Sequence, residues 1–134
     1  MGDRAVIVLD THAWIWWAAG SGRLPAVARH TIDGAAAVGV CAISLWEVAM
    51  LVVKRRLELD REPLEWMKQA LALPRVELMP ISPAIASGAA GLPSAFPGDP
   101  ADRLIVATAL DQRVAIVTRD ARIRGFAGVA TVWS

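Results

Sequence analysis

The sequence has one cysteine, no asparagine and almost no net charge, and each shortage excludes a class of protein. The single cysteine, Cys41, can form neither an internal disulfide nor a thiolate metal cluster. Without asparagine there is no N-glycosylation site. The 14 Lys and Arg residues against 13 Asp and Glu give a net charge of +1, which does not indicate a strongly basic nucleic-acid binder. We therefore expect a reduced, cytoplasmic protein.

Long apolar runs that could cross a membrane are also missing. The longest uncharged stretch, residues 78–98, is interrupted by Pro80, Pro83, Pro93 and Pro97, so no continuous helix spans it. The first residues carry an acid where a secretory signal requires cations. No membrane association is expected.

What the chain does contain is enough apolar material for a core. Hydrophobic residues make up 55% and charged residues 20% of the 134 positions, which excludes intrinsic disorder. This length is typical of one domain, and we expect residues 1–134 to form a single one.

Apolar runs rich in β-branched residues alternate with helical patterns along the chain. We predict strands over residues 5–9, 36–42, 76–79, 114–118 and 129–133. We predict helices over residues 11–19, 25–32, 44–56, 83–90 and 100–112, with a further helix after a cap at Asp60. This alternation favours an α/β fold of three layers, with a mainly parallel central sheet and helices on both faces.

Five acidic residues fall where predicted strands end or helices begin: Asp10, Glu47, Asp99, Asp102 and Asp120. In an open parallel sheet these junctions lie along one edge, where ligands bind. Acids spread over more than a hundred residues of sequence are therefore expected to meet in one pocket.

Helix capping is the simpler explanation for each acid taken alone. Glu47 fits a capping box with Ser44, and Asp99 fits an N-cap before Pro100. Asp10 and Asp120 also precede predicted helices. We assign Asp99 to capping, and the sequence leaves the alternative open for the others.

Capping does not explain why the whole set is acidic, since Ser, Thr or Asn would cap without mutual repulsion. Converging carboxylates repel by about 1 kcal/mol per pair in water, and by more when they are partly buried. A site that tolerates this repulsion normally holds a cation. Because the ligands would be oxygens, the expected ion is Mg²⁺, with Mn²⁺ able to replace it.

The acids lie in four sequence blocks that resemble those of PIN-domain ribonucleases, most closely the VapC-type toxins of bacterial toxin–antitoxin pairs. In chain order, the blocks are residues 8–17 (VLDTHAWIWW), 43–49 (ISLWEVA), 99–109 (DPADRLIVATA) and 117–120 (VTRD). The likeness covers nearly the whole chain. It implies a PIN-like fold.

The resemblance also implies an acidic quartet of Asp10, Glu47, Asp102 and Asp120 around the metal, with Asp10 and Asp102 as direct ligands. It implies an endoribonuclease that uses a metal-activated water and leaves a 5′-phosphate and a 3′-hydroxyl. A homodimer and a cognate antitoxin that covers the acidic pocket are implied as partners. The antitoxin and the RNA substrate are not identified by the sequence.

Other residues near the acids have both structural and functional explanations. His12 is interpreted as structural, and most of the tryptophans as core or interface residues. Arginines beside Asp120 and the basic run 54–56 are candidates for binding RNA phosphates, or only solvated charges. Residues 44–56 carry apolar side chains nearly all round, which suggests a second chain against this helix.

Rival functions find less support. A phosphatase with an aspartyl-phosphate intermediate would place a second acid at position 12, which is histidine, and a receiver domain requires a lysine after a late strand, whereas the last lysine is Lys68. No glycine-rich turn for a dinucleotide follows the first strand. The remaining alternative is a catalytically inactive PIN-like module that sequesters RNA or a protein partner.

Overall fold

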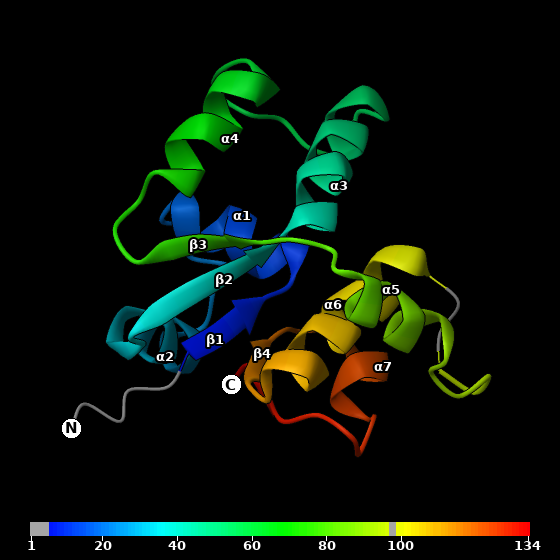
Figure 1. Cartoon of the computed structure of the whole chain (residues 1–134). Coiled ribbons are helices and arrows are strands. Elements are labelled where there is room, and N and C mark those ends of the chain that lie inside the picture. The colour runs from blue at the N-terminus through cyan, green and yellow to red at the C-terminus, as the bar shows by residue number, and fades with distance from the viewer. Residues whose placement is uncertain (1–5, 97–98) are drawn as a thin grey trace.

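Five short parallel strands form the central sheet of the computed structural model, which describes residues 6–96 and 99–134 (Figure 1). The strands are β1 (Val6–Leu9), β2 (Ala37–Cys41), β3 (Val76–Met79), β4 (Ala115–Val117) and β5 (Thr131–Val132), in the spatial order β3-β2-β1-β4-β5. β1 is therefore central, with parallel neighbours on both sides. The chain leaves β1 for β2 on one side and later returns to β4 on the other, which makes the β1–β4 boundary the switch point of the sheet.

The strands are joined by helices, and Figure 1 shows α5, α6 and α7 gathered on one side, away from α1 and α2. The helices are α1 (Thr11–Ala18), α2 (Ala26–Gly34), α3 (Ala42–Val53), α4 (Pro63–Leu71), α5 (Pro83–Ala90), α6 (Pro100–Gln112) and α7 (Ala121–Arg124). Within the described residues, no helix is long and apolar enough to cross a membrane.

Two separate apolar clusters cover the two faces of the sheet. Ile7 and Leu9 of β1 belong to the cluster that also contains buried residues of α1, α2 and α4, whereas Val8 belongs to the cluster with α6 and α7. Alternate side chains of a strand point to opposite faces, so β1 is buried on both faces by helices. This confirms the predicted α/β fold of three layers.

Two predicted helix starts are wrong. The third helix begins at Ala42 rather than Ser44, because Cys41 at the end of β2 already adopts the N-cap conformation. Asp60 caps no helix: it is paired with Arg61, and α4 begins after Glu62. The short helix α7 was not predicted, since four residues are too few to show a helical period.

Candidate active site

The carboxyl ends of β1 and β4 place two of the predicted acids at the switch point of the sheet. Asp10 directly follows β1, and its amide donates to the carbonyl of Val117 in β4 at 3.1 Å. Asp120 lies just beyond β4, and its backbone amide donates a hydrogen bond to Thr118 Oγ1 at 2.9 Å. The parallel pairing of β1 with β4 thus fixes the two carboxylates at one edge.

All four residues of the predicted quartet line one cavity of about 420 Å³. Glu47 comes from α3, Asp102 from the first turn of α6, and Asp10 and Asp120 from the strand ends. Asp99 lines the same cavity. We call it the acidic cavity.

Three of these acids are also helix caps, and capping engages the Oδ1 atom in each. Asp10 Oδ1 accepts from the amide of Ala13 at 2.8 Å, and Asp120 Oδ1 from the amide of Arg122 at 2.8 Å. Asp99 Oδ1 accepts from the amides of Ala101 and Asp102, at 2.9 and 3.2 Å, which agrees with its assignment as a cap. Capping and cavity lining are therefore combined in Asp10, Asp99 and Asp120.

Glu47 is held differently from the prediction. Because α3 begins at Ala42, Ser44 lies inside the helix and Glu47 is more than one turn from its start, so no capping box forms. Instead the Thr11 hydroxyl donates to Glu47 Oε1, and Thr11 Oγ1 lies 2.9 Å from Ser44 Oγ. Thr11 and Ser44 are buried, so this network holds the Glu47 carboxylate toward α1.

Burial and mutual repulsion make the acids reluctant to ionise. Burial, followed by the negative charges of Asp99, Asp120 and Glu47, raises the pKa of Asp102 to about 7. Burial also raises the pKa of Glu47 and that of Asp10, although hydrogen bonds from Thr11 and Thr118 oppose the two shifts. Such clustered carboxylates with raised pKa values are typical of a site that binds a cation.

Asp120 differs because Arg122 lies beside it. Burial alone would raise the pKa of Asp120, but hydrogen bonds from the side chain and backbone of Arg122 outweigh burial and lower it. The Arg122 guanidinium lies 3.3 Å from Asp120 Oδ2 and 3.5 Å from Asp102 Oδ2. It partly balances the acidic cavity from the solvent side, where its side chain is 61% exposed.

A histidine and an arginine complete the wall of the acidic cavity. His12 is partly buried with its ring 5.6 Å from that of Trp16, and burial lowers its pKa. The Arg119 guanidinium lies 4.7 Å from the Trp16 ring centre, which is a cation–π contact. The structure thus places His12 at the cavity, where the sequence suggested only a structural role.

The donors at the acidic cavity suit a hard divalent cation. Carboxylate oxygens are the ligands preferred by Mg²⁺ and Mn²⁺, and capping occupies one oxygen each of Asp10 and Asp120. Over residues 6–96 and 99–134, however, no three carboxylate, histidine or cysteine groups are already arranged as ligands of one ion. The residue types fit the ion, and binding it requires side-chain adjustment that brings their oxygens together.

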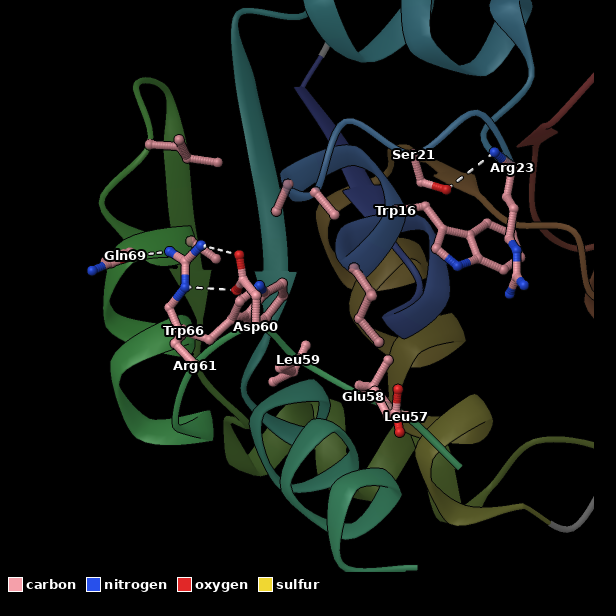
Figure 2. Close-up of a pocket in the computed structure, with 15 residues that line it drawn as sticks. Trp16, Ser21, Arg23, Leu57, Glu58, Leu59, Asp60, Arg61, Trp66 and Gln69 are labelled. Atoms are coloured by element: carbon pink, nitrogen blue, oxygen red, sulfur yellow. Dashed lines mark hydrogen bonds and ion pairs between the residues drawn. The ribbon is translucent and has the colours of Figure 1, made fainter. Parts of the chain in front are cut away.

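A larger groove borders the acidic cavity across Trp16. It has a volume of about 580 Å³ and runs between α1, the segment 57–61 and α4. Figure 2 shows Trp16 and Arg23 on one wall, facing Asp60, Arg61 and Gln69 on the other, with Leu57 and Leu59 between them. Trp16 contacts His12 and Arg119 of the acidic cavity, so the two depressions are neighbours. We call this depression the α1–α4 groove.

Three residues form contacts with the acids of the cavity that the sequence did not predict. Thr11 and Thr118 hydrogen-bond to Glu47 and Asp10, and Arg122 spans Asp102 and Asp120. The two threonines lie inside the sequence blocks quoted above, next to or near an acid. That position is the signal that could have identified them.

Comparison with known proteins identifies the family of the chain. The PIN domain family matches residues 7–129. The chain belongs to the PIN domain family. Over 118 residues it is 42% identical to Ribonuclease VapC22 of Mycobacterium tuberculosis, covering 88% of this chain and 89% of that protein. This PIN domain is thus of the VapC type, as the sequence blocks suggested.

Solved structures share its fold. The complex of VapBC2 from Rickettsia felis with a DNA fragment from its promoter contains a chain with a TM-score of 0.72 and 15% identity, covering 96% of this chain and 99% of that one. VapBC-5 from Mycobacterium tuberculosis gives a TM-score of 0.63 at 18% identity, covering 97% and 99%. At these identities the likeness shows the fold of this PIN domain.

Proposed function

We propose that this PIN domain is a Mg²⁺-dependent endoribonuclease that acts as the toxin of a toxin–antitoxin pair. The observation that carries the proposal is the meeting of Asp10, Glu47, Asp102 and Asp120 in one cavity, where the pKa of Asp102 is raised to about 7. The 42% identity to a protein named a ribonuclease supports RNA as the substrate.

In this proposal Asp10 and Asp102 hold the ion directly, and Glu47 and Asp120 bind a second ion or ordered waters. Mn²⁺ is expected to replace Mg²⁺. When bound, the ion supplies activation of a water molecule and neutralisation of charge at the scissile phosphate. Glu47 is kept in place by the Thr11 hydroxyl, and Asp10 by the amide of Ala13.

The cations at the rim have a separate part. Arg119 and Arg122 line the acidic cavity and are exposed, so they are placed to bind RNA phosphates that flank the scissile one. They offset the repulsion between the acidic cavity and the phosphate backbone. Lys54, Arg55 and Arg56 are exposed just beyond α3 and are not among the residues that line the cavity.

An inactive binding module is the weaker alternative. A module that only sequesters a partner has no need of four converging carboxylates, which cost stability in the absence of a cation. Cleavage of RNA that depends on the quartet distinguishes the two.

For the antitoxin, the α1–α4 groove is the proposed binding surface. It exposes apolar side chains beside polar ones, and it adjoins the acidic cavity at Trp16. A segment bound in this groove would extend over His12 and Arg119 and cover the acidic cavity. Solved complexes of the VapBC type with similar folds support such a partner.

A homodimer is proposed from the exposed side of α3. Its apolar residues are only partly covered in the single chain: Trp46 is 60% exposed and Val53 is 73% exposed. Such large apolar side chains on one helix are typical of an interface. Residues 1–134 as one domain, and a cytoplasmic location, remain proposals from composition and length.

Metal-dependent cleavage of RNA by matched variants tests the proposed function. Asp10→Asn and Asp102→Asn should each reduce Mg²⁺-dependent cleavage by at least about a hundredfold, because losing a direct ligand costs more than losing an outer contact. Asp99→Asn is the control, and should keep cleavage close to that of the wild type because asparagine caps a helix as well as aspartate. Equal losses in all three variants would contradict the assignment of Asp99 and Asp102.

A further inference from the structure

A second cavity adjoins the acidic cavity on the side of α7. It has a volume of about 640 Å³, and Phe96, Phe126, Ala95 and Gly125 line it. Ala121 and Arg122 line both this cavity and the acidic cavity, so the two cavities adjoin each other at α7. We call it the phenylalanine cavity.

The rings of Phe96 and Phe126 form an aromatic part of the cavity wall. Phe96 and Phe126 pack edge to face, with ring centres 5.3 Å apart and an angle of 75° between their planes. Phe96 is buried, whereas Phe126 is partly exposed. A partly exposed aromatic ring in a concave site offers a flat surface on which a second ring can stack.

Arg103 of α6 holds the segment that carries Phe96 in place. The Arg103 guanidinium donates to the carbonyls of Ala89 at 3.0 Å, Leu92 at 2.8 Å and Phe96 at 3.4 Å. It also lies 5.8 Å from the centre of the Phe96 ring. These bonds hold the segment from the end of α5 to Phe96 in place, so the cavity is formed before any ligand binds.

Arg122 marks the boundary between the two cavities. Its guanidinium reaches Asp102 and Asp120, yet its side chain is 61% exposed, so it can also face a ligand. A guanidinium binds phosphate in a two-pronged geometry. A phosphate at this boundary would have the acidic cavity on one side and the aromatic surface on the other.

We propose that the phenylalanine cavity binds one unpaired nucleobase of the RNA, next to the scissile phosphate, and thereby selects which sequences are cleaved. The inference rests on the proposed ribonuclease function. Any base can stack on an aromatic ring, and differences in stacking strength between bases give a modest preference. The volume lies within the range of sites for small ligands, and the shared border with the acidic cavity favours a nucleotide over an unconnected ligand.

Two variants alter the phenylalanine cavity in opposite ways. Phe126→Ala removes the stacking surface, and Ala95→Trp fills the cavity from an exposed position without removing a core side chain. Ala86→Trp, at an exposed position on α5 that does not line the cavity, is the matched control. Thermal melts identify any variant that fails to fold.

The experiment sequences the ends produced from a randomised single-stranded RNA library and measures kcat and KM on one cleaved RNA. For the wild type and Ala86→Trp we expect a base preference at one position beside the cut. Phe126→Ala and Ala95→Trp should lose that preference and raise KM by about tenfold, the size of one lost base stack, with kcat nearly unchanged.

The outcomes separate the two proposals. If the wild type cleaves and both variants keep its base preference and KM, the phenylalanine cavity is not a base site. If the wild type cleaves no RNA, the proposed ribonuclease function fails, and binding of the single-stranded library in EDTA tests the cavity alone. Equal binding of this RNA by the wild type and Ala95→Trp would then overturn the inference. Ala95→Trp that binds the antitoxin more weakly but RNA as well as the wild type would also overturn it.

Discussion

Neutralising Asp102 should stabilise this protein when no divalent ion is present. Asp102 lies among Asp99, Asp120 and Glu47, whose negative charges disfavour its ionised form. Asp102→Asn removes one charge from this group and keeps the shape of the side chain. Independent helix caps predict no such gain, because asparagine would replace aspartate almost neutrally.

The raised pKa gives the size of the effect. A rise from 3.8 to about 7 is about three pKa units, or about 4 kcal/mol of lost folding stability at most. The side chain is 18% exposed, so screening by water is limited, but loss of the Asp102–Arg122 pair subtracts up to about 1 kcal/mol. Burying the uncharged amide of the new asparagine subtracts a further part of the gain in folding stability. We expect a net gain of about 2 kcal/mol, or about 8 °C in melting temperature for a chain of 134 residues.

The raised pKa of Asp102 also determines how its stability penalty changes with pH. A carboxyl group with a raised pKa binds its proton more tightly in the folded than in the unfolded chain, so ionising it costs stability. Below about pH 4 the group is protonated in both states and Asp102 imposes no penalty. The penalty grows between about pH 4 and pH 7 and is complete above about pH 8.

Thermal melts in EDTA at several pH values therefore test the magnitude and its cause. The wild type and Asp102→Asn should melt at similar temperatures at pH 4 and differ by about 8 °C at pH 8. Asp111→Asn, an exposed position near the end of α6, is the control and should follow the wild type throughout. Mn²⁺ or Mg²⁺ should then raise the melting temperature of the wild type with concentration, and that of Asp102→Asn much less. No gain in EDTA, together with equal responses to the ions, would refute a repulsive cation site.

Three further predictions concern growth, assembly and the support of Glu47. Expression of the chain alone should arrest bacterial growth, and co-expression of its antitoxin should restore it; arrest by Asp10→Asn would point to sequestration instead of RNA cleavage. Trp46→Glu should convert a dimer to a monomer in light scattering, because Trp46 is 60% exposed on α3, and an unchanged mass would place the interface elsewhere. Thr11→Val should lower stability by about 1–3 kcal/mol in urea unfolding by leaving Ser44 and Glu47 without their shared partner. Thr11→Val with Ser44→Ala should recover the part of the loss that comes from the unpaired Ser44 hydroxyl. Additive losses in the double variant would contradict the coupling.

Most of the fold could be predicted because the central strands β1 and β2 are buried on both faces, whereas the edge strands β3 and β5 are partly exposed. Strands such as β1 are continuous β-branched runs, which the sequence displays directly. The first residue of a helix was harder to predict where the residues before it could also be helical. At α3, Ser44 offers a start signal through its capping pattern with Glu47, but Cys41 at the end of β2 already adopts the N-cap conformation, which the sequence does not display.

The acids of the cavity could be predicted, but their hydrogen-bond partners could not. Parallel strands bring their carboxyl ends to one edge, so the position of an acid after a strand is informative in itself. The bond from Thr11 to Glu47 joins residues 36 positions apart and depends on how α1 packs against α3. The position of Thr11 beside Asp10 could have drawn attention to this threonine, but no local pattern identifies Glu47 as its partner.

The choice between helix caps and a cation site turns out not to be exclusive in this PIN domain. Asp10, Asp99 and Asp120 each cap a helix through Oδ1, and the partial positive charge of a helix N-terminus offsets part of their repulsion. Glu47 and Asp102 cap no helix, although Asp102 lies in the first turn of α6; both have raised pKa values, as does Asp10 despite its cap. An acid that caps is therefore weak evidence of function, because capping alone justifies it. The acids that cap nothing and still converge on the others, Glu47 and Asp102, are the stronger support for the proposed cation site, and they are the reason to test this site with metal ions first.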